Sequence, residues 1–391
     1  MGIEKPALRV ALADNTVGAA EIAAVNEVLT SGWLSAGPVT RTFEEEFAEA
    51  MGVTDAVAVS SGTAALHLAM LALNLGPGDE VIVPSLSFVA SAAMVALCGG
   101  TPVFADVLSA EEPTIAPAEV RRLLGPRTRA VVVMHYGGYP ARTAEIADLA
   151  RAHGAAVVED AAHAPLVRSP EGTLGTIGDF GCFSFHATKN LTTGEGGMVL
   201  ARRPEQLDLI RLKHSHHVTR TTWERAHTGG SDYDVNGIGL NYRPTEISSA
   251  IGRTQLARLA EDRAVRRRLV HRYRDLLRSV PEIGIPFARH VADSAFHLMA
   301  ILLPAGLPRD AVVSRLRDEG VQTSVHYRPT HLFSAYREGP DPAERRLPVT
   351  ERMAGRLLTL PLHARMTEDD VTHVVTVLTA AVRPAGRAET T

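Results

Sequence analysis

The chain has 391 residues, which is long enough to bury a large hydrophobic core without help from metal ions or disulfide bonds. Its 45% hydrophobic and 21% charged residues exclude a chain that is disordered throughout. A formal net charge of −4 excludes a general basic surface, so we expect neither nucleic acid nor membrane partners. The only two cysteines, Cys98 and Cys182, exclude a disulfide framework and a cysteine-rich zinc site.

The N-terminal residues carry charges among their apolar side chains, without the continuous apolar stretch of a signal peptide. The longest apolar stretches, such as 64–73, are shorter than the roughly 20 residues that cross a bilayer. Together with the low cysteine content, these features predict a cytoplasmic protein.

From residue 55 to about 200, short β-type stretches alternate with helical ones. The expected strands lie at 56–60, 80–85, 101–107, 129–136, 155–160, 180–186 and 196–201. The expected helices lie between them, at 61–76, 87–100, 117–124 and 145–154. This alternation favours a mainly parallel sheet. Ligands bind such sheets beyond the carboxyl ends of the strands, so we expect the site at that edge.

The remainder of the chain has a different pattern. The longest helical candidate, 245–280, carries a face of apolar side chains and ends before Pro281. It is followed by an apolar stretch at 297–304, a helix at 308–319, the segment 321–329 and a helix near 367–382. We therefore expect a large domain over 1–250, then a linking helix and a small α/β domain over 251–391 with a flexible tail at 384–391.

Residues 60–70, SSGTAALHLAM, place a turn between a strand and a helix. The first N–H groups of a helix have no partners within it, and the helix dipole is positive there. Gly62 allows close approach, and the hydroxyl groups of Ser61 and Thr63 can donate, so the turn can hold a phosphate. Alone, such a turn is more often only a helix N-cap.

Asp160 stands at the carboxyl end of an expected buried strand, with His163 three residues later. The carboxylate either caps the next helix or, if buried, pairs with a cationic ring nitrogen. Lys189 follows a strand that carries Ser184 and precedes a glycine-rich turn that contains Glu195. An isolated lysine is ordinarily a solvated charge, but between apolar strands its pKa is lowered and its amine becomes a nucleophile.

The three motifs occur in a set order along the chain: a phosphate-binding turn, an acid and an amine. Those are the protein groups that pyridoxal 5′-phosphate (PLP) requires for its phosphate, its pyridine nitrogen and its Schiff base. The glycine-rich turn is not a nucleotide-binding P-loop, because no G-x-x-x-x-G-K-[ST] is present.

Five segments carry a resemblance to a known family: SSGTAALHLA (60–69), EDAAHA (159–164), TKNLTTGEGGM (188–198), LNYRPTEISSAIGRTQL (240–256) and VHYRPTHLF (325–333). They resemble the DegT/DnrJ/EryC1/StrS family of PLP-dependent sugar aminotransferases, over about residues 10–380. The resemblance implies an α/β fold, the PLP-dependent transferase fold type I. In that fold a mainly parallel seven-stranded sheet lies between helices, beside a smaller C-terminal α/β domain.

The resemblance assigns three catalytic residues. Lys189 would bind the cofactor covalently and move protons, and Asp160 would keep the pyridine nitrogen protonated. His163 stands where many members have glutamine; either side chain can hydrogen-bond the phenolic oxygen of the cofactor. A histidine, unlike glutamine, can also titrate near neutral pH.

The resemblance also implies the remaining contacts. Gly62, Thr63 and Ser184 would bind the cofactor phosphate, and Phe88 would stack on its ring. Asn241 would reach the phosphate from the neighbouring subunit, so the working unit would be a homodimer with shared active sites. Three residues would contact the substrate: Arg243, His326 and Tyr327.

The implied reaction moves an amino group from an amino acid to a keto-sugar in amino-sugar or antibiotic biosynthesis. The expected donor is L-glutamate, and the expected keto-sugar is nucleotide-linked. The cofactor would alternate between PLP and pyridoxamine phosphate. Three alternatives stay open: a PLP-dependent sugar dehydratase or lyase, a cyclitol aminotransferase, and a relative that binds PLP or a sugar without catalysis. Lys189 disfavours the dehydratase, because relatives of that kind replace this lysine with histidine.

Two charged segments have ordinary interpretations. The histidines of 213–217, KHSHH, are too close together for an i, i+4 metal pair, so we expect no metal site and favour contact with substrate. The arginine-rich helix 251–278 is interpreted as a solvated face at a domain junction rather than a nucleic-acid surface.

Overall fold

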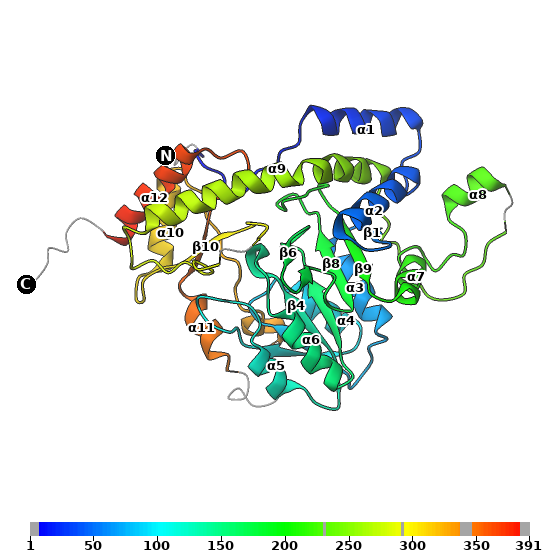
Figure 1. Ribbon diagram of the computed structural model, residues 1–391, viewed down its shortest axis with the longest axis horizontal. Coiled ribbons are helices and arrows are strands. Elements are labelled where there is room, and N and C mark those ends of the chain that lie inside the picture. Colours follow the sequence, from blue (N-terminus) through cyan, green and yellow to red (C-terminus); the bar gives the residue numbers. More distant parts are fainter. Residues whose placement is uncertain (1–7, 230–231, 291–292, 337–345, 384–391) are drawn as a thin grey trace, which may run out of the picture.

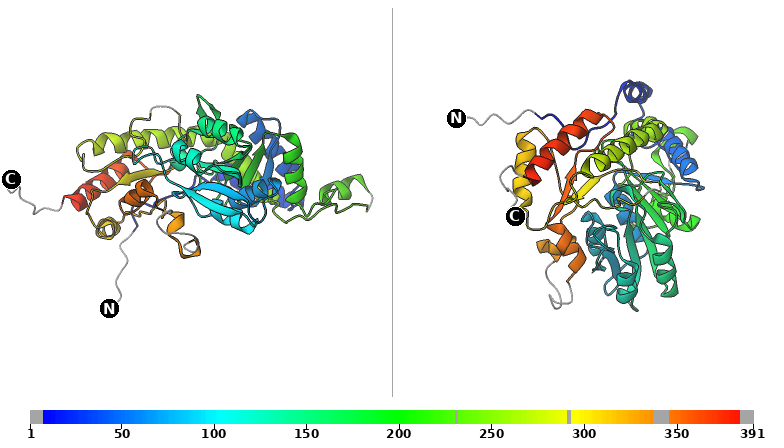
Figure 2. Two further views of the ribbon diagram at one scale, coloured as in Figure 1. Left: turned by 90° about the horizontal axis from the view of Figure 1, so that it is seen from below. Right: turned by 60° about the vertical axis from the view of Figure 1, so that its left-hand side comes forward.

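A computed structural model describes residues 8–229, 232–290, 293–336 and 346–383. The expected tail at 384–391 lies outside the described residues. In Figure 1, a central sheet is covered by helices, and the long helix α9 (Glu246–Leu277) runs from above the sheet toward the C-terminal elements. The short helix α8 (Thr222–Thr228) projects away from the rest, as Figure 2 also shows.

The main sheet has seven strands in the order β1-β9-β8-β5-β4-β2-β3. Their bounds are β1 Val57–Val59, β2 Glu80–Pro84, β3 Thr101–Ala105, β4 Thr128–Met134, β5 Ala156–Asp160, β8 Phe180–Ser184 and β9 Gly197–Ala201. Strand β9 pairs antiparallel with β8 and β1, while the pairs from β8 across to β3 are parallel. The mainly parallel seven-stranded sheet is therefore confirmed.

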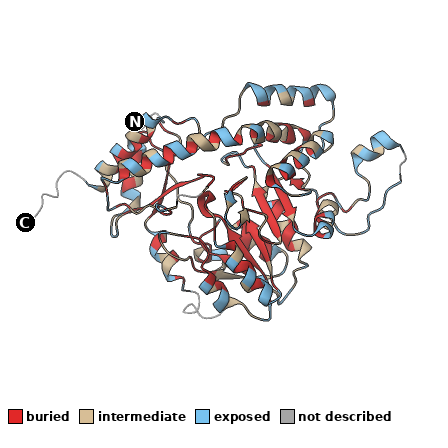
Figure 3. Ribbon diagram, viewed as in Figure 1, coloured by how far each residue is buried: buried red, intermediate tan, exposed pale blue. Residues whose placement is uncertain are grey.

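Helices cover both faces of this sheet. Their bounds are α1 Ala19–Ser31, α2 Pro38–Met51, α3 Gly62–Ala72, α4 Ala90–Leu97, α5 Pro117–Leu123, α6 Thr143–Ala152 and α7 Pro204–Lys213. Neighbouring residues of a strand point to opposite faces. Accordingly Val132 packs in the cluster with α3, α4 and α7, whereas Val131 and Val133 pack with α5 and α6. Figure 3 shows the resulting buried strands between partly exposed helices.

The elements before residue 55 are absent from the sequence-based assignment. Helix α2 buries Phe43, Phe47 and Met51, which recur every four residues, against α9 and the β8–β9 part of the sheet. Helix α1 buries only Glu21 and Val28, so it has almost no apolar periodicity to detect. It is held against α9, where the side chain of Gln255 donates to Glu21 at 2.8 Å.

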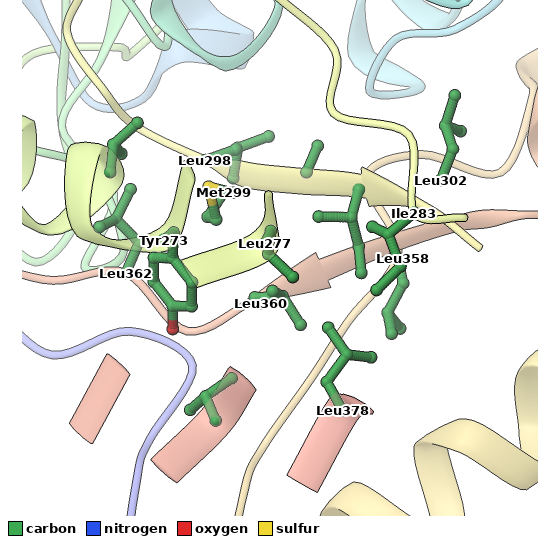
Figure 4. Packing of buried hydrophobic residues seen from close by; sticks show 14 of the residues in the cluster. Tyr273, Leu277, Ile283, Leu298, Met299, Leu302, Leu358, Leu360, Leu362 and Leu378 are labelled. Carbon is green, nitrogen blue, oxygen red and sulfur yellow. The ribbon is translucent and has the colours of Figure 1, made fainter. Parts of the chain in front are cut away.

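The C-terminal elements form a second core. Their bounds are β10 Met299–Leu302, α10 Arg309–Asp318, α11 Pro348–Ala354, β11 Leu357–Leu360 and α12 Glu368–Val382, with short 3₁₀ turns at Tyr136–Gly138, Thr330–Leu332 and Ser334–Tyr336 elsewhere. Strands β10 and β11 pair antiparallel, and their side chains pack against α9 and α12, as Figure 4 shows around Tyr273, Leu277 and Leu360. The segment 321–329 contributes two isolated bridges rather than a strand.

Several arginines of α9 are bound within the chain, so the expected solvated face is wrong in part. Arg266 is buried and donates to the carbonyl oxygen of Leu362 at 2.9 Å. Arg253 pairs with Glu46 at 2.6 Å. These two arginines join α9 to other elements of the chain.

Two adjacent acidic residues at the carboxyl end of β5 serve opposite faces of the sheet. Asp160 and Glu159 are neighbours and so point to opposite faces. Glu159 accepts hydrogen bonds from the backbone N–H groups of Gly175, Ile177 and Gly178, at 2.6–2.8 Å. His135 Nε2 lies 2.8 Å from the same carboxylate. These contacts hold the loop that leads into β8. A two-stranded ribbon, β6 (Arg168–Ser169) and β7 (Gly172–Thr173), precedes this loop.

Candidate active site

A cavity of about 360 Å³ opens at the carboxyl ends of β4, β5 and β8, the edge at which the sequence predicts a site. Met134, Asp160 and Ser184, the last residues of those three strands, line it. The other lining residues include Ser61, Gly62, Thr63, Phe88, His163, His186, Lys189, Glu195, His297, His326 and Tyr327. The structure therefore brings most of the predicted site residues together.

Asp160 is the buried acid of this cavity. Its carboxylate accepts from Ser91 Oγ at 3.3 Å and from the backbone N–H of Ala162 at 3.2 Å. Burial raises its pKa, against the opposing effects of these hydrogen bonds and of the nearby Lys189. A buried carboxylate with two weak donors among the described residues is suited to a further cationic partner, such as a protonated ring nitrogen.

Lys189 lies in the turn that follows β8. Its backbone N–H donates to the carbonyl oxygen of His186 at 2.8 Å. Burial lowers the pKa of its amine to about 8, while the negative charge of Asp160 acts in the opposite direction. An amine of this kind is a nucleophile at moderately alkaline pH.

The N-terminus of α3 forms the third part of the cavity. Ser61 caps the helix by accepting from the backbone N–H of Ala64 at 3.0 Å. A Cβ added to Gly62 would lie 2.7 Å from the Cβ of Ser184, so only glycine lets these two segments meet. With Thr63, they present a hydroxyl-rich cup at the positive end of a helix, which suits a phosphate.

His163 is buried and uses both of its ring nitrogens within the protein. Nδ1 accepts from the backbone N–H of Gly137 at 3.3 Å, and Nε2 lies 2.9 Å from the hydroxyl of Tyr327. Burial, with Lys189 as the next contribution, lowers the pKa of His163 well below its ordinary value. A lowered pKa favours the neutral imidazole near neutral pH, contrary to the expectation that His163 titrates there.

His297 is a cavity residue that sequence reasoning missed. Its Nδ1 lies 3.0 Å from Oδ1 of Asn190, and its ring centroid lies 4.3 Å from that of His163. It begins the expected apolar stretch 297–304, and nothing in that pattern places a histidine in the cavity. The one sequence signal was its partner Asn190, which directly follows Lys189 in the motif 188–198.

Phe88, His326 and Tyr327 also reach the cavity. Phe88 is 54% exposed, and its ring centroid lies 6.0 Å from that of Tyr327. His326 Nδ1 lies 3.0 Å from the hydroxyl of Thr359 on β11, and its pKa is lowered to about 4, chiefly by burial. An exposed aromatic ring at the cavity is free to cover a planar ligand.

Asn241 and Arg243 lie apart from this cavity. Asn241 is exposed and bridges to Ser215, and Arg243 donates to the hydroxyl of Ser215 at 2.9 Å. Two histidines of the nearby 213–217 segment, His214 and His217, bond to Arg211 and Asn236, and neither lines the cavity. Among the described residues, no group of three or more His, Cys, Asp or Glu side chains is arranged to hold a metal ion.

The sheet, the buried acid–amine pair and the helix N-terminus define the class of PLP-dependent aminotransferases of fold type I. The chain belongs to the DegT/DnrJ/EryC1/StrS aminotransferase family, whose profile matches residues 15–379. Aminotransferases of this family depend on PLP, and the solved structures similar to this chain include PLP and PMP forms.

Three relatives give the extent of the similarity. The chain is 38% identical over 376 residues to the spore coat polysaccharide biosynthesis protein SpsC of Bacillus subtilis, covering 94% of this chain and 96% of that one. The aminotransferase TlmJ from Streptoalloteichus hindustanus superposes with a TM-score of 0.88 at 38% identity, covering 95% and 98%. DesI, solved in the presence of its TDP-sugar product, gives 0.85 at 31% identity, covering 97% and 94%. The chain is therefore an aminotransferase of a family whose members include sugar aminotransferases.

The cavity fits PLP in three respects. Gly62 lets the N-terminus of α3 pack directly against Ser184, so the free backbone N–H groups of the helix and the hydroxyl of Ser184 lie together for a phosphate. Asp160 is a buried carboxylate suited to a cationic nitrogen, and Lys189 is the amine that a Schiff base needs.

In the described part of the chain, no helix is both long enough and apolar enough to cross a bilayer.

Proposed function

We propose that this protein transfers an amino group from L-glutamate to a nucleotide-linked keto-sugar, in the biosynthesis of an amino sugar for a natural product. The observation that carries the proposal is the presence of Lys189 and Asp160 in one cavity beside the N-terminus of α3. The similarity to DesI, solved with a TDP-sugar product, supports a nucleotide-linked acceptor.

We assign the cofactor contacts by the chemistry of each group. Gly62, Thr63 and Ser184 would hold the phosphate at the positive end of α3. Phe88 would cover one face of the ring. Asp160 would keep the ring nitrogen protonated, and the positive charge of that nitrogen would in turn favour the ionised carboxylate. When bound, PLP supplies an electron sink for the substrate carbon that loses or gains a proton.

Lys189 acts as the base and the acid of the transfer. Its amine takes a proton from the carbon of the amino donor and returns one to the carbon of the sugar. A pKa of about 8 is close to the working pH, and such a match serves proton transfer in both directions. His326 and Tyr327, which line the same cavity, contact the sugar.

The working unit is a homodimer with shared active sites, in the cytoplasm. Asn241 supports this proposal because it is exposed and outside the cavity of its own chain. It would contact the cofactor phosphate of the neighbouring subunit, and Arg243, two residues later, would contact the sugar. The division of the chain into 1–250 and 251–391 stays a prediction.

The first test is the absorbance spectrum of the purified protein before and after addition of L-glutamate. We expect a visible Schiff-base band that bleaches as 2-oxoglutarate appears. A TDP-linked keto-hexose added next should restore the band and yield the amino sugar.

Other outcomes of this test separate the alternatives. Loss of water from the sugar without consumption of glutamate would indicate a dehydratase instead. Restoration of the band by a free cyclitol ketone alone would indicate a cyclitol aminotransferase. A band that neither donor nor acceptor alters would contradict the proposal.

A further inference from the structure

Asn190 directly follows Lys189, and its buried amide is bound at both ends. Its Nδ2 donates to the carbonyl oxygen of Ala295 at 2.6 Å, and its Oδ1 lies 3.0 Å from Nδ1 of His297. The carbonyl oxygen can only accept, so it fixes the orientation of the amide. The amide oxygen can also only accept, so His297 carries a proton on Nδ1 and donates it to Asn190.

The segment that Asn190 contacts, 294–297, is itself held at the turn that follows strand β4. The backbone N–H of Ala295 donates to the carbonyl oxygen of Gly138 at 3.1 Å. The backbone N–H of His297 donates to the carbonyl oxygen of Gly137 at 3.0 Å. A Cβ added to Gly138 would lie 2.7 Å from that of Ala295, so the two segments are in close contact. Asn190 is therefore attached to a fixed part of the cavity wall.

The turn that carries Lys189 has little else to hold it on its outer side. Residues 186–188 are exposed, and strand β8 ends at Ser184, so the pairing of the strands does not by itself place the amine. Among the described residues, the amine of Lys189 has no hydrogen-bond partner; burial and the charge of Asp160 are what act on it. The place of the amine therefore depends on the backbone on which it stands, and Asn190 is the next residue of that backbone.

We propose that Asn190 and His297 are positioning residues that act through Lys189, by holding its turn so that the amine reaches the carbon that loses or gains a proton. A buried polar network whose members all have partners holds them in one arrangement. Proton transfer needs this arrangement, because a misplacement of about 1 Å can cost about a hundredfold in rate. The inference rests on the proposed role of Lys189 and not on the proposed sugar acceptor.

The first measurement uses no substrate. It is the pH midpoint at which the apoenzyme captures PLP, followed by stopped-flow absorbance in the wild type, Asn190→Ala, His297→Leu and the double variant. In Asn190→Ala the turn is released and the amine moves toward water, which removes part of the burial that lowers its pKa. The midpoint should therefore rise by about one pH unit. His297→Leu removes one of the two anchors of the amide and should raise the midpoint by less. The double variant should match Asn190→Ala.

Other titrations do not differ between these variants. Free PLP titrates in the same way in every experiment. The other titratable side chains that line the cavity with Lys189 are unchanged throughout: Asp160, His163, His186, Glu195, His326 and Tyr327.

His297→Asn is the matched control. Its amide nitrogen takes the place of the histidine Nδ1 and can still donate to Asn190. The midpoint in this variant should stay near that of the wild type. If the imidazole acted by its bulk alone, His297→Asn would shift the midpoint as much as His297→Leu, and that result would overturn the proposal.

The second measurement is the half-reaction of the holoenzyme with L-glutamate, with hydrogen or deuterium on the α-carbon. Asn190→Ala should lower the maximal rate about ten- to a hundredfold and raise the isotope effect, because proton transfer becomes the slow step. The glutamate concentration for half-saturation should stay within about twofold of the wild-type value. A loss confined to this concentration, with the maximal rate unchanged, would contradict a positioning role.

The remaining outcomes also decide the matter. A folded Asn190→Ala with an unchanged midpoint and rate would overturn the proposal. Equal shifts from His297→Leu with and without Asn190→Ala would overturn it as well, because His297 would then act on Lys189 without Asn190. If Asn190→Ala does not fold, a shift in His297→Leu that His297→Asn lacks supports the proposal, and its absence overturns it.

Lys189→Ala separates this inference from the proposed function. A Schiff-base band in Lys189→Ala would contradict the proposed role of the lysine. If that band is absent and the midpoint of Asn190→Ala is unmoved, only the role of Asn190 and His297 is contradicted.

Discussion

The cavity and the projecting segment around α8 differ in how complete they are within one chain. The cavity is built from strand ends, and its buried groups Asp160 and His163 have partners in the same chain. The segment 214–229 and 232–241 is exposed for most of its length, and Ile238 is 89% exposed. An exposed large apolar side chain beside the exposed Asn241 is typical of a surface that contacts another molecule. One chain supplies the groups of the cavity, whereas the exposed segment is where we expect a second chain to make contact.

The largest effect is expected at the cavity. Lys189→Ala removes the Schiff base and the proton carrier together, so transamination should fall at least about a thousandfold. Steady-state production of 2-oxoglutarate from glutamate measures this loss. Lys189→Arg is the matched control, since it retains a positive charge without a nucleophilic amine. It should be equally inactive, and activity in the arginine variant would contradict the assignment of Lys189.

The projecting segment is tested by mixing two inactive variants. Asn241→Asp places a negative charge next to the phosphate and should inactivate the sites to which it contributes. If Asn241 serves the partner, subunits exchanged between Lys189→Ala and Asn241→Asp form heterodimers with one intact site. Activity should then return to about a quarter of the wild-type value. No recovery, with heterodimers shown by differential tagging, would mean that Asn241 serves its own chain.

The smallest effect is a shift in pH dependence. Because burial lowers the pKa of Lys189 to about 8, the rate at which the apoenzyme captures PLP should rise with pH around that value. Asp160 raises the pKa of Lys189, so Asp160→Asn should move the midpoint to lower pH. Stopped-flow absorbance of PLP capture measures both midpoints. An unchanged or higher midpoint in the asparagine variant would show that the two groups do not interact.

The sequence was sufficient to predict the place of a residue where that place follows from the helix or strand in which the residue lies. Asp160 and Ser184 end strands that periodicity predicts, and the long helix starts after its cap Thr245. Parallel strands end at one edge of a sheet, so the main contents of the cavity could be predicted.

The remaining features depend on contacts between distant segments. His297 enters the cavity because Asn190 and Ala295 hold it there, and no periodicity predicts such a contact. The pairing of His163 with Tyr327 also joins residues far apart in sequence. Arg266 looks like a surface charge in a helical pattern, and only the approach of Leu362 buries it.

Glu159 gives strand β5 a second role, as the residue that anchors the loop before the neighbouring strand β8. The next residue of the strand is Asp160, which lines the cavity, while the Glu159 carboxylate accepts hydrogen bonds from the loop between Gly175 and Gly178 that leads into β8. The strand after that loop leads directly to Lys189. Because β5 and β8 pair directly through their backbones, that pairing sets their spacing, and Glu159 instead fixes the path of the loop by which the chain enters β8.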